Sequence, residues 1–195
     1  MKSNYFLALF LGCVSFFSCE VPSKTITIDN PSPEKVVMVL DGIETIEVLA
    51  GEAKRVLTRF GKREISVNGG EAEAIELKPD LDYLLNPTKS TYYVENIYYF
   101  FSKSARESHL RYNKSKDTIQ VGGMVLNGEF RRIKNQILIP KAWTFGPTEM
   151  PWEAVQVQKR NASQDYQVTQ KLYREQDLVV RALQVILMGD PEEVQ

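Results

Sequence analysis

Turn-forming residues recur about every ten residues between positions 24 and 78, and this spacing limits the folds open to the chain more than any other feature. The stretches between the turns are short. They alternate apolar with polar residues or are rich in β-branched residues, as half-buried strands are. We expect six strands, at residues 25–28, 36–40, 43–49, 54–59, 64–67 and 73–77. Short strands at this spacing predict a small β-sandwich over residues 24–88.

The dipeptide Asp41-Gly42 gives the sharpest local prediction in this region. It joins two apolar runs directly. A type I′ turn requires positive φ at both of its central residues, and Asp-Gly adopts that conformation at low cost. We therefore expect a hairpin with a two-residue connection at this point.

Residues 89–195 are expected to form a second β-rich part that ends in a helix at about residues 175–188. Apolar residues from Leu178 to Leu187 recur at helical spacing, and Gly189 and Pro191 close the helix. One long helix over residues 165–188 is the alternative, but the β-forming alternation of residues 166–173 favours a strand first. The other expected strands are 92–101, 119–121, 124–126, 130–133, 136–139 and 155–158.

The N-terminus has the layout of a secretory signal. Lys2 supplies a short positive region, and an apolar run follows from Tyr5 to Phe17. This run is shorter than the roughly 20 residues that a membrane-spanning helix needs. We expect residues 1–18 to be a signal peptide that is removed on export.

The apolar run ends at Phe16-Phe17-Ser18-Cys19, where a small residue directly precedes a cysteine. This arrangement resembles a lipobox of the Bacteroidota type. The resemblance implies a diacylglyceryl group on Cys19, cleavage before it, and residues 19–23 as a lipidated tether. Phe10-Leu11-Gly12-Cys13 is a competing box with a shorter apolar core. An ordinary signal peptide beside an unmodified cysteine is the remaining alternative.

The β-rich block also carries a resemblance. Its residues are Asn30-Pro31, Asp41-Gly42, Leu49-Ala50-Gly51-Glu52 and Phe60-Gly61-Lys62. They are similar to the turns of immunoglobulin-like and PEGA-like modules in bacterial envelope proteins, which share a sandwich fold and no common activity. The segments 84–88, 92–94 and 139–146 resemble parts of uncharacterised bacterial lipoproteins. That likeness implies a location in the envelope and no reaction.

Charge and cysteine content exclude several classes of function. The formal net charge is −1, and it becomes −2 without the signal because Lys2 is the only charged residue lost. This near-neutral balance argues against a nucleic-acid partner. Cys13 leaves with the signal and Cys19 is lipidated, so we expect no disulfide, thiol nucleophile or cysteine metal site. We expect the lipid to be the only membrane anchor, in the outer membrane and facing either way.

A catalytic site is not expected. His109 is the only histidine and lies in a polar segment, 103–116, that is interpreted as an exposed excursion or a short surface helix. A Ser-His-Asp site needs a positioned imidazole, and a histidine zinc site needs more than one. We therefore interpret His109 as a solvated residue and expect no metal and no cofactor. Clustered carboxylates keep an enzyme as the third hypothesis; they are Glu71, Glu73, Glu76, Glu192 and Glu193.

Two groups of aromatic residues are the strongest candidates for contact with a ligand. The first is Tyr92, Tyr93, Tyr98, Tyr99, Phe100 and Phe101. Alternating rings on a strand favour a role in the core for this group. The second is Trp143, Phe145 and Trp152. A role in the core is favoured for this group as well, but less strongly, because it lies in a proline-containing loop where large rings are less readily buried. Exposed rings there would stack on sugars or anchor a protein partner.

The leading hypothesis is a non-enzymatic envelope lipoprotein that acts as an interaction or accessory module. Its expected partners are the membrane, through the lipid, and an envelope protein or glycan. The second hypothesis is a glycan-binding module that uses Trp143, Phe145 and Trp152. Asp117-Thr118-Ile119 resembles an O-glycosylation motif of Bacteroidota envelope proteins and marks Thr118 as a candidate site.

Overall fold

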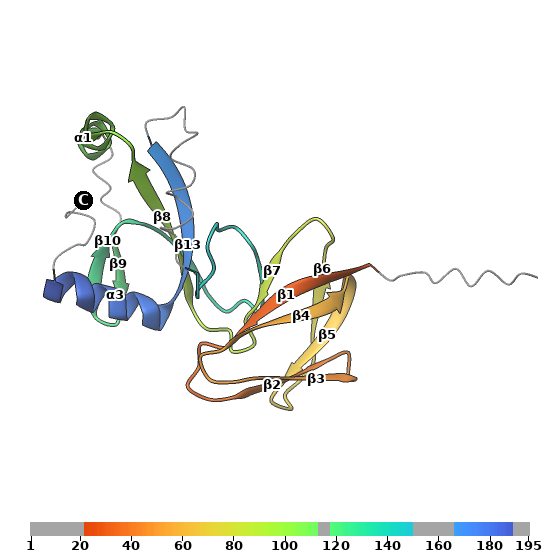
Figure 1. Ribbon diagram of the computed structural model, residues 1–195. Helices are drawn as coiled ribbons and strands as arrows, with labels where there is room; N and C mark the ends of the chain where they lie inside the picture. The colour runs from red at the N-terminus through yellow and green to blue at the C-terminus, as the bar shows by residue number, and fades with distance from the viewer. Residues whose placement is uncertain (1–21, 113–117, 150–165, 189–195) are drawn as a thin grey trace, which may run out of the picture.

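The computed structural model describes residues 22–112, 118–149 and 166–188. Within these ranges the protein is mainly β and ends in a helix, α3 (Glu175–Met188), which confirms the predicted fold class (Figure 1). The predicted signal peptide, Cys19 and the strand expected at 155–158 lie outside the described residues.

All six strands expected in the first part are present. They are β1 (Ser23–Asp29), β2 (Val36–Leu40), β3 (Glu44–Val48), β4 (Ala53–Arg59), β5 (Gly61–Val67) and β6 (Glu73–Leu77). They belong to two sheets. The first has the order β12-β7-β1-β4 and includes two later strands, β7 (Tyr83–Leu85) and β12 (Leu138–Pro140), and the second has the order β3-β2-β5-β6. Phe60 alone separates β4 from β5, and Gly61 has a φ of 101°, a conformation that glycine adopts most readily. The chain therefore crosses from one sheet to the other in a single step.

The hairpin at Asp41-Gly42 has the predicted backbone and a longer loop. Asp41 and Gly42 have φ values of 50° and 68°, and the Ile43 amide donates to the Leu40 carbonyl at 3.1 Å. Strand pairing resumes only at Glu44, opposite Leu40. The predicted two-residue connection is therefore wrong by one residue, because Ile43 bulges outward and is almost fully exposed.

The sandwich encloses one apolar core. Its inward-facing residues come from both sheets, as the alternation in each strand predicts. The fully buried members include Ile28, Met38, Leu40, Val48, Ile65 and Leu85. Burying an aliphatic side chain of this size stabilises a fold by about 1.5–3 kcal/mol, so this set supplies a large part of the stability of the sandwich.

The second part is built around a three-stranded antiparallel sheet of order β11-β8-β13. The strands of this sheet are β8 (Tyr92–Phe100), β11 (Glu129–Ile133) and β13 (Tyr166–Arg174), and beside it lie α1 (Lys103–Tyr112), β9 (Thr118–Val121) and β10 (Met124–Asn127). Two short strands, β7 (Tyr83–Leu85) and β12 (Leu138–Pro140), belong to the first sheet of the sandwich. The strand expected at 136–139 is found slightly later, as β12. The preference for a strand before the last helix is confirmed by β13 and α3.

Both faces of this sheet are covered near its base. On one face, Tyr93 packs with Val121 of the β9-β10 hairpin and with Leu178 of α3. On the other face, Tyr92, Val94 and Leu172 pack against the sandwich. Since β12 pairs with β7, a strand from the second part also completes the first sheet of the sandwich. The two parts are therefore joined by backbone pairing as well as by side-chain packing.

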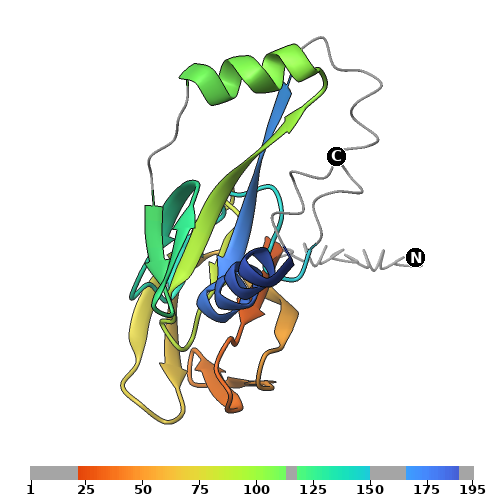
Figure 2. The same ribbon diagram turned by 90° about the vertical axis from the view of Figure 1, so that its left-hand side faces the viewer.

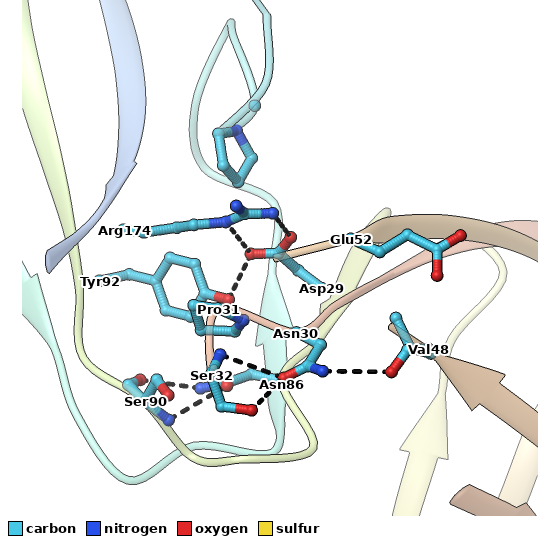
Figure 3. Close-up of polar contacts among 12 residues, drawn as sticks. Asp29, Asn30, Pro31, Ser32, Val48, Glu52, Asn86, Ser90, Tyr92 and Arg174 are labelled. Carbon is cyan, nitrogen blue, oxygen red and sulfur yellow. Dashed lines mark hydrogen bonds and ion pairs between the residues drawn. The ribbon is translucent and has the colours of Figure 1, made fainter. Parts of the chain in front are cut away.

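A buried ion pair lies at this joint (Figure 3). Asp29, at the end of β1, is fully buried, and Arg174, at the end of β13, is 7% exposed. The Arg174 Nε donates to Asp29 Oδ2 at 3.0 Å and its Nη2 donates to Oδ1, while the Tyr92 hydroxyl donates to Oδ2 at 2.6 Å. The hydrogen bond with Asp29 raises the pKa of Arg174, and burial raises the pKa of Tyr92. The carboxylate therefore connects three strands from both parts.

Two buried asparagines organise the loops beside this ion pair in the same way (Figure 3). Asn30 and Asn86 are each followed by proline and then by a hydroxyl residue. In each loop the amide nitrogen donates to the carbonyl four residues later, at 2.8 Å and 2.9 Å. The same nitrogen also donates to a carbonyl of a separate segment, Val48 for Asn30 and Gln136 for Asn86. Each side chain therefore replaces backbone hydrogen bonds that a loop leaves unmade.

The ion pair leads to a stability prediction. We expect Arg174→Met to lower the free energy of unfolding by about 3–5 kcal/mol, because it leaves the Asp29 carboxylate buried without its cation. Adding Asp29→Leu and Tyr92→Phe removes the groups left unpartnered and should restore part of the loss. Urea denaturation of the three proteins measures this. As a control, Lys35→Ala, at an exposed pair 3.3 Å from Glu47, should cost less than about 1 kcal/mol. A triple variant less stable than Arg174→Met would contradict the argument.

Candidate functional site

The free ends of β8 and β13 carry a set of rings on one side of the sheet, which we call the aromatic face. It consists of Tyr98 and Phe100 on β8 and Tyr166 on β13. Residues two apart on a strand share a face, and Tyr166 is paired directly with Phe100. Strand β11 pairs with β8 only as far as Asn96, so the rings stand on a two-stranded ribbon beyond it.

The three rings of the aromatic face are almost equally spaced. The centroid of Tyr98 lies 6.3 Å from that of Phe100 and 6.1 Å from that of Tyr166, and Phe100 and Tyr166 are 6.0 Å apart. These separations fall in the range of about 4.5–7 Å that interacting aromatic rings prefer. Tyr166 is 44% exposed, and its neighbour Val168 is 41% exposed. The aromatic face is therefore a partly open apolar surface.

A fixed carboxylate borders the aromatic face. The Tyr98 hydroxyl donates to Glu129 Oε2 at 2.8 Å, and Asn96 Nδ2 donates to the same oxygen at 3.1 Å. The hydrogen bond from Asn96 lowers the pKa of Glu129, and the hydrogen bond from Tyr98 acts in the same direction. Burial and the bond to Glu129 raise the pKa of Tyr98 to about 12. The site thus combines apolar ring faces with an ionised acceptor.

His109 belongs to this site, so its interpretation as a solvated residue is wrong. It lies on α1, partly buried, with its ring centroid 4.3 Å from Tyr98, 5.0 Å from Phe100 and 6.4 Å from Tyr166. The polar sequence of α1 conceals this contact, because a lone histidine in a charged helix gives no periodic apolar signal. The alternation Asn96-Tyr98-Phe100 is the signal that points to the aromatic face.

The three aromatics predicted to bind a ligand are not brought together in the described structure. Trp143 is only 8% exposed and packs with Tyr92 and Leu172, as the favoured core role predicts, so its ring is not available to a ligand. Phe145 is partly buried and forms a parallel bridge with Lys171. Trp152 lies outside the described residues. The loop from 143 to 146 follows the edge of β13, which explains the burial of Trp143.

Lys171 holds this loop in place. Its ammonium group donates to the carbonyls of Gly146, Pro147 and Glu149, the last two at 3.0 Å and 2.6 Å. It also lies 5.5 Å from the centroid of the Tyr173 ring. Burial lowers the pKa of Lys171 to about 8, and the nearby Glu149 acts in the opposite direction. All three acceptors lie in one tight segment, so we assign Lys171 a structural role.

The other predicted sites are not among the residues of the aromatic face, and Glu192 and Glu193 lie outside the described residues. Thr118 is exposed at the start of β9, opposite Asn127. Glu73 pairs with Lys89 at 2.5 Å, whereas Glu71 and Glu76 are exposed. Among the described residues no group of three or more histidine, cysteine or acidic side chains is arranged to hold a metal ion. Within the same ranges no helix has both the length and the apolarity of a membrane span.

Comparison with protein families, curated proteins and solved structures finds no match to this chain. The functional argument therefore rests on the residues of the site.

The carboxylate at the border of the aromatic face gives a prediction. We expect Asn96→Leu to raise the pKa of the Glu129 carboxyl, because the hydrogen bond that lowers it most is lost. Carboxyl-carbon NMR titration of the labelled protein measures this shift. The control is Gln120→Leu, which removes an amide side chain at an exposed position on β9. An unchanged Glu129 titration in Asn96→Leu would show that the hydrogen bond is not formed in solution.

Proposed function

We propose that the chain is a lipid-anchored protein of the bacterial envelope that acts by binding rather than by catalysis. The anchor is the diacylglyceryl group on Cys19, and the expected location is the outer membrane. The binding surface is the aromatic face. The observation that carries the proposal is the set of three evenly spaced rings beside an ionised carboxylate on a partly exposed ribbon.

The aromatic face suits a carbohydrate. One side of a pyranose ring presents its C–H groups as an apolar surface, which packs well on the flat face of Tyr166 or Phe100. Hydroxyl groups at the rim of the sugar donate hydrogen bonds to a carboxylate, and Glu129 lies beside the rings with its pKa lowered. This replaces Trp143, Phe145 and Trp152 with Tyr98, Phe100 and Tyr166 as the expected contacts of a glycan.

The chain also commits its only histidine to this surface. The His109 ring contacts the rings of Tyr98 and Phe100.

The anchor is tested by metabolic labelling with palmitate. We expect the wild-type chain to incorporate the label and Cys19→Ser to lose it, because the thiol of Cys19 is the acceptor. Cys13→Ser serves as the control and should be labelled like the wild type. Label retained in Cys19→Ser and lost in Cys13→Ser would move the anchor to Cys13.

The binding surface is tested on an array of neutral and anionic oligosaccharides with the full-length protein in detergent. We expect Tyr166→Ala to weaken binding by about two- to tenfold, the loss that corresponds to one aromatic contact. Leu57→Ala is the matched control, because Leu57 is an exposed apolar residue on β4. A silent array, or equal binding by wild type and Tyr166→Ala, would reject the carbohydrate proposal.

A further inference from the structure

Helix α1 partly covers the aromatic face. It lies across the tips of β8 and β13, as Figure 2 shows. His109 is the residue of α1 that stands over the three rings, closest to Tyr98 at 4.3 Å. Tyr166 is farthest from it at 6.4 Å and keeps 44% of its surface exposed. A molecule approaching the face would therefore meet Tyr166 first and the His109 ring next.

The described side chains of α1, from Lys103 to His109, are not deeply buried. Each of them is either exposed or partly buried. Lys103 and Glu107 form an ion pair within the helix at 3.9 Å, and both side chains are more than half exposed. A polar helix of ten residues is marginal by itself in water. The contacts of His109 with Tyr98 and Phe100 are among those that hold α1 over the rings.

The link between β8 and α1 is short and well defined. Phe101 and Ser102 alone connect Phe100, the last residue of β8, to Lys103. The Ser102 hydroxyl accepts from the Ala105 amide at 3.2 Å, and its carbonyl accepts from the Arg106 amide at 3.2 Å. These bonds cap the start of the helix. Both hydrogen bonds lie within residues 102–106, so they remain intact when α1 rotates relative to β8.

We propose that α1 is a cap on the aromatic face that opens locally, and that the His109 ring occupies the place that the pyranose ring of a bound glycan takes. This inference rests on the proposed function, because it concerns access to the same rings. A sugar stacked on Tyr98 and Phe100 and the imidazole of His109 compete for the same ring faces. Binding at the full aromatic face therefore requires α1 to swing away, with Tyr166 as the first contact.

The test is native-state amide hydrogen exchange of the full-length protein in detergent micelles over a series of urea concentrations. We expect the amides of residues 104–109 to exchange through local opening with little dependence on urea, whereas Val94 and Leu172 exchange only on global unfolding. His109→Ala should speed exchange in α1 by about two- to tenfold, since a ring contact is lost. Ser108→Ala is the matched control, because both substitutions raise helix propensity and only one removes a ring contact.

Nitration of tyrosine by tetranitromethane, located by mass spectrometry, gives a second reading. We expect His109→Ala to increase the nitration rate of Tyr98, with the fully buried Tyr92 as the unreactive reference. The cap is rejected if the α1 amides follow the urea dependence of Leu172, or if His109→Ala changes neither rate. A silent glycan array with local opening intact would reject the ligand and leave the cap. Sugar binding without local opening would reject the cap and leave the ligand.

Discussion

The pairing of Asp29 with Arg174 is the interaction on which the rest of the structure depends. A carboxylate that is fully excluded from water is tolerated only with a cation and with its oxygens hydrogen-bonded. Here one guanidinium and one phenol satisfy both needs. Because the carboxylate belongs to the sandwich and its partners belong to the second sheet, the position of each part is fixed relative to the other.

That fixed position sets the geometry of the aromatic face. The face of β8 and β13 that packs on the sandwich through Tyr92 and Leu172 is the same face that bears Tyr98 and Phe100 further along. Its lower half is thus a core and its upper half a surface. The change occurs at Asn96, the last residue of β8 that pairs with β11. Glu129, the first residue of β11, is its partner there and supplies the charge.

Local patterns were enough to predict much of this fold. Alternation and turn residues placed β1 to β6, and the helical spacing of apolar residues placed α3. Asp29 shows where such reasoning stops. It stands in a cluster of turn residues, Asp29-Asn30-Pro31-Ser32-Pro33, and a turn accounts for it completely unless Arg174 is known to lie beside it. The same holds for His109, whose partners are on strands that its own helix does not reveal. The reason for the burial of Trp143 is also non-local: the prolines near it indicate a loop, and they do not indicate that this loop lies against the edge of β13.

The sequence separation of the ion pair bears on how the chain reaches its native state. Asp29 and Arg174 are 145 residues apart, and β12, which completes the first sheet, lies beyond residue 137. A polypeptide is synthesised from its N-terminus, so the sandwich strands are present long before β12 and Arg174 are made. The edge of β7 stays unpaired until β12 is present, and the carboxylate of Asp29 stays hydrated until β13 is present. Contacts of such long range make folding slow. Folding of this protein is therefore completed only when its last strand, β13, has been made.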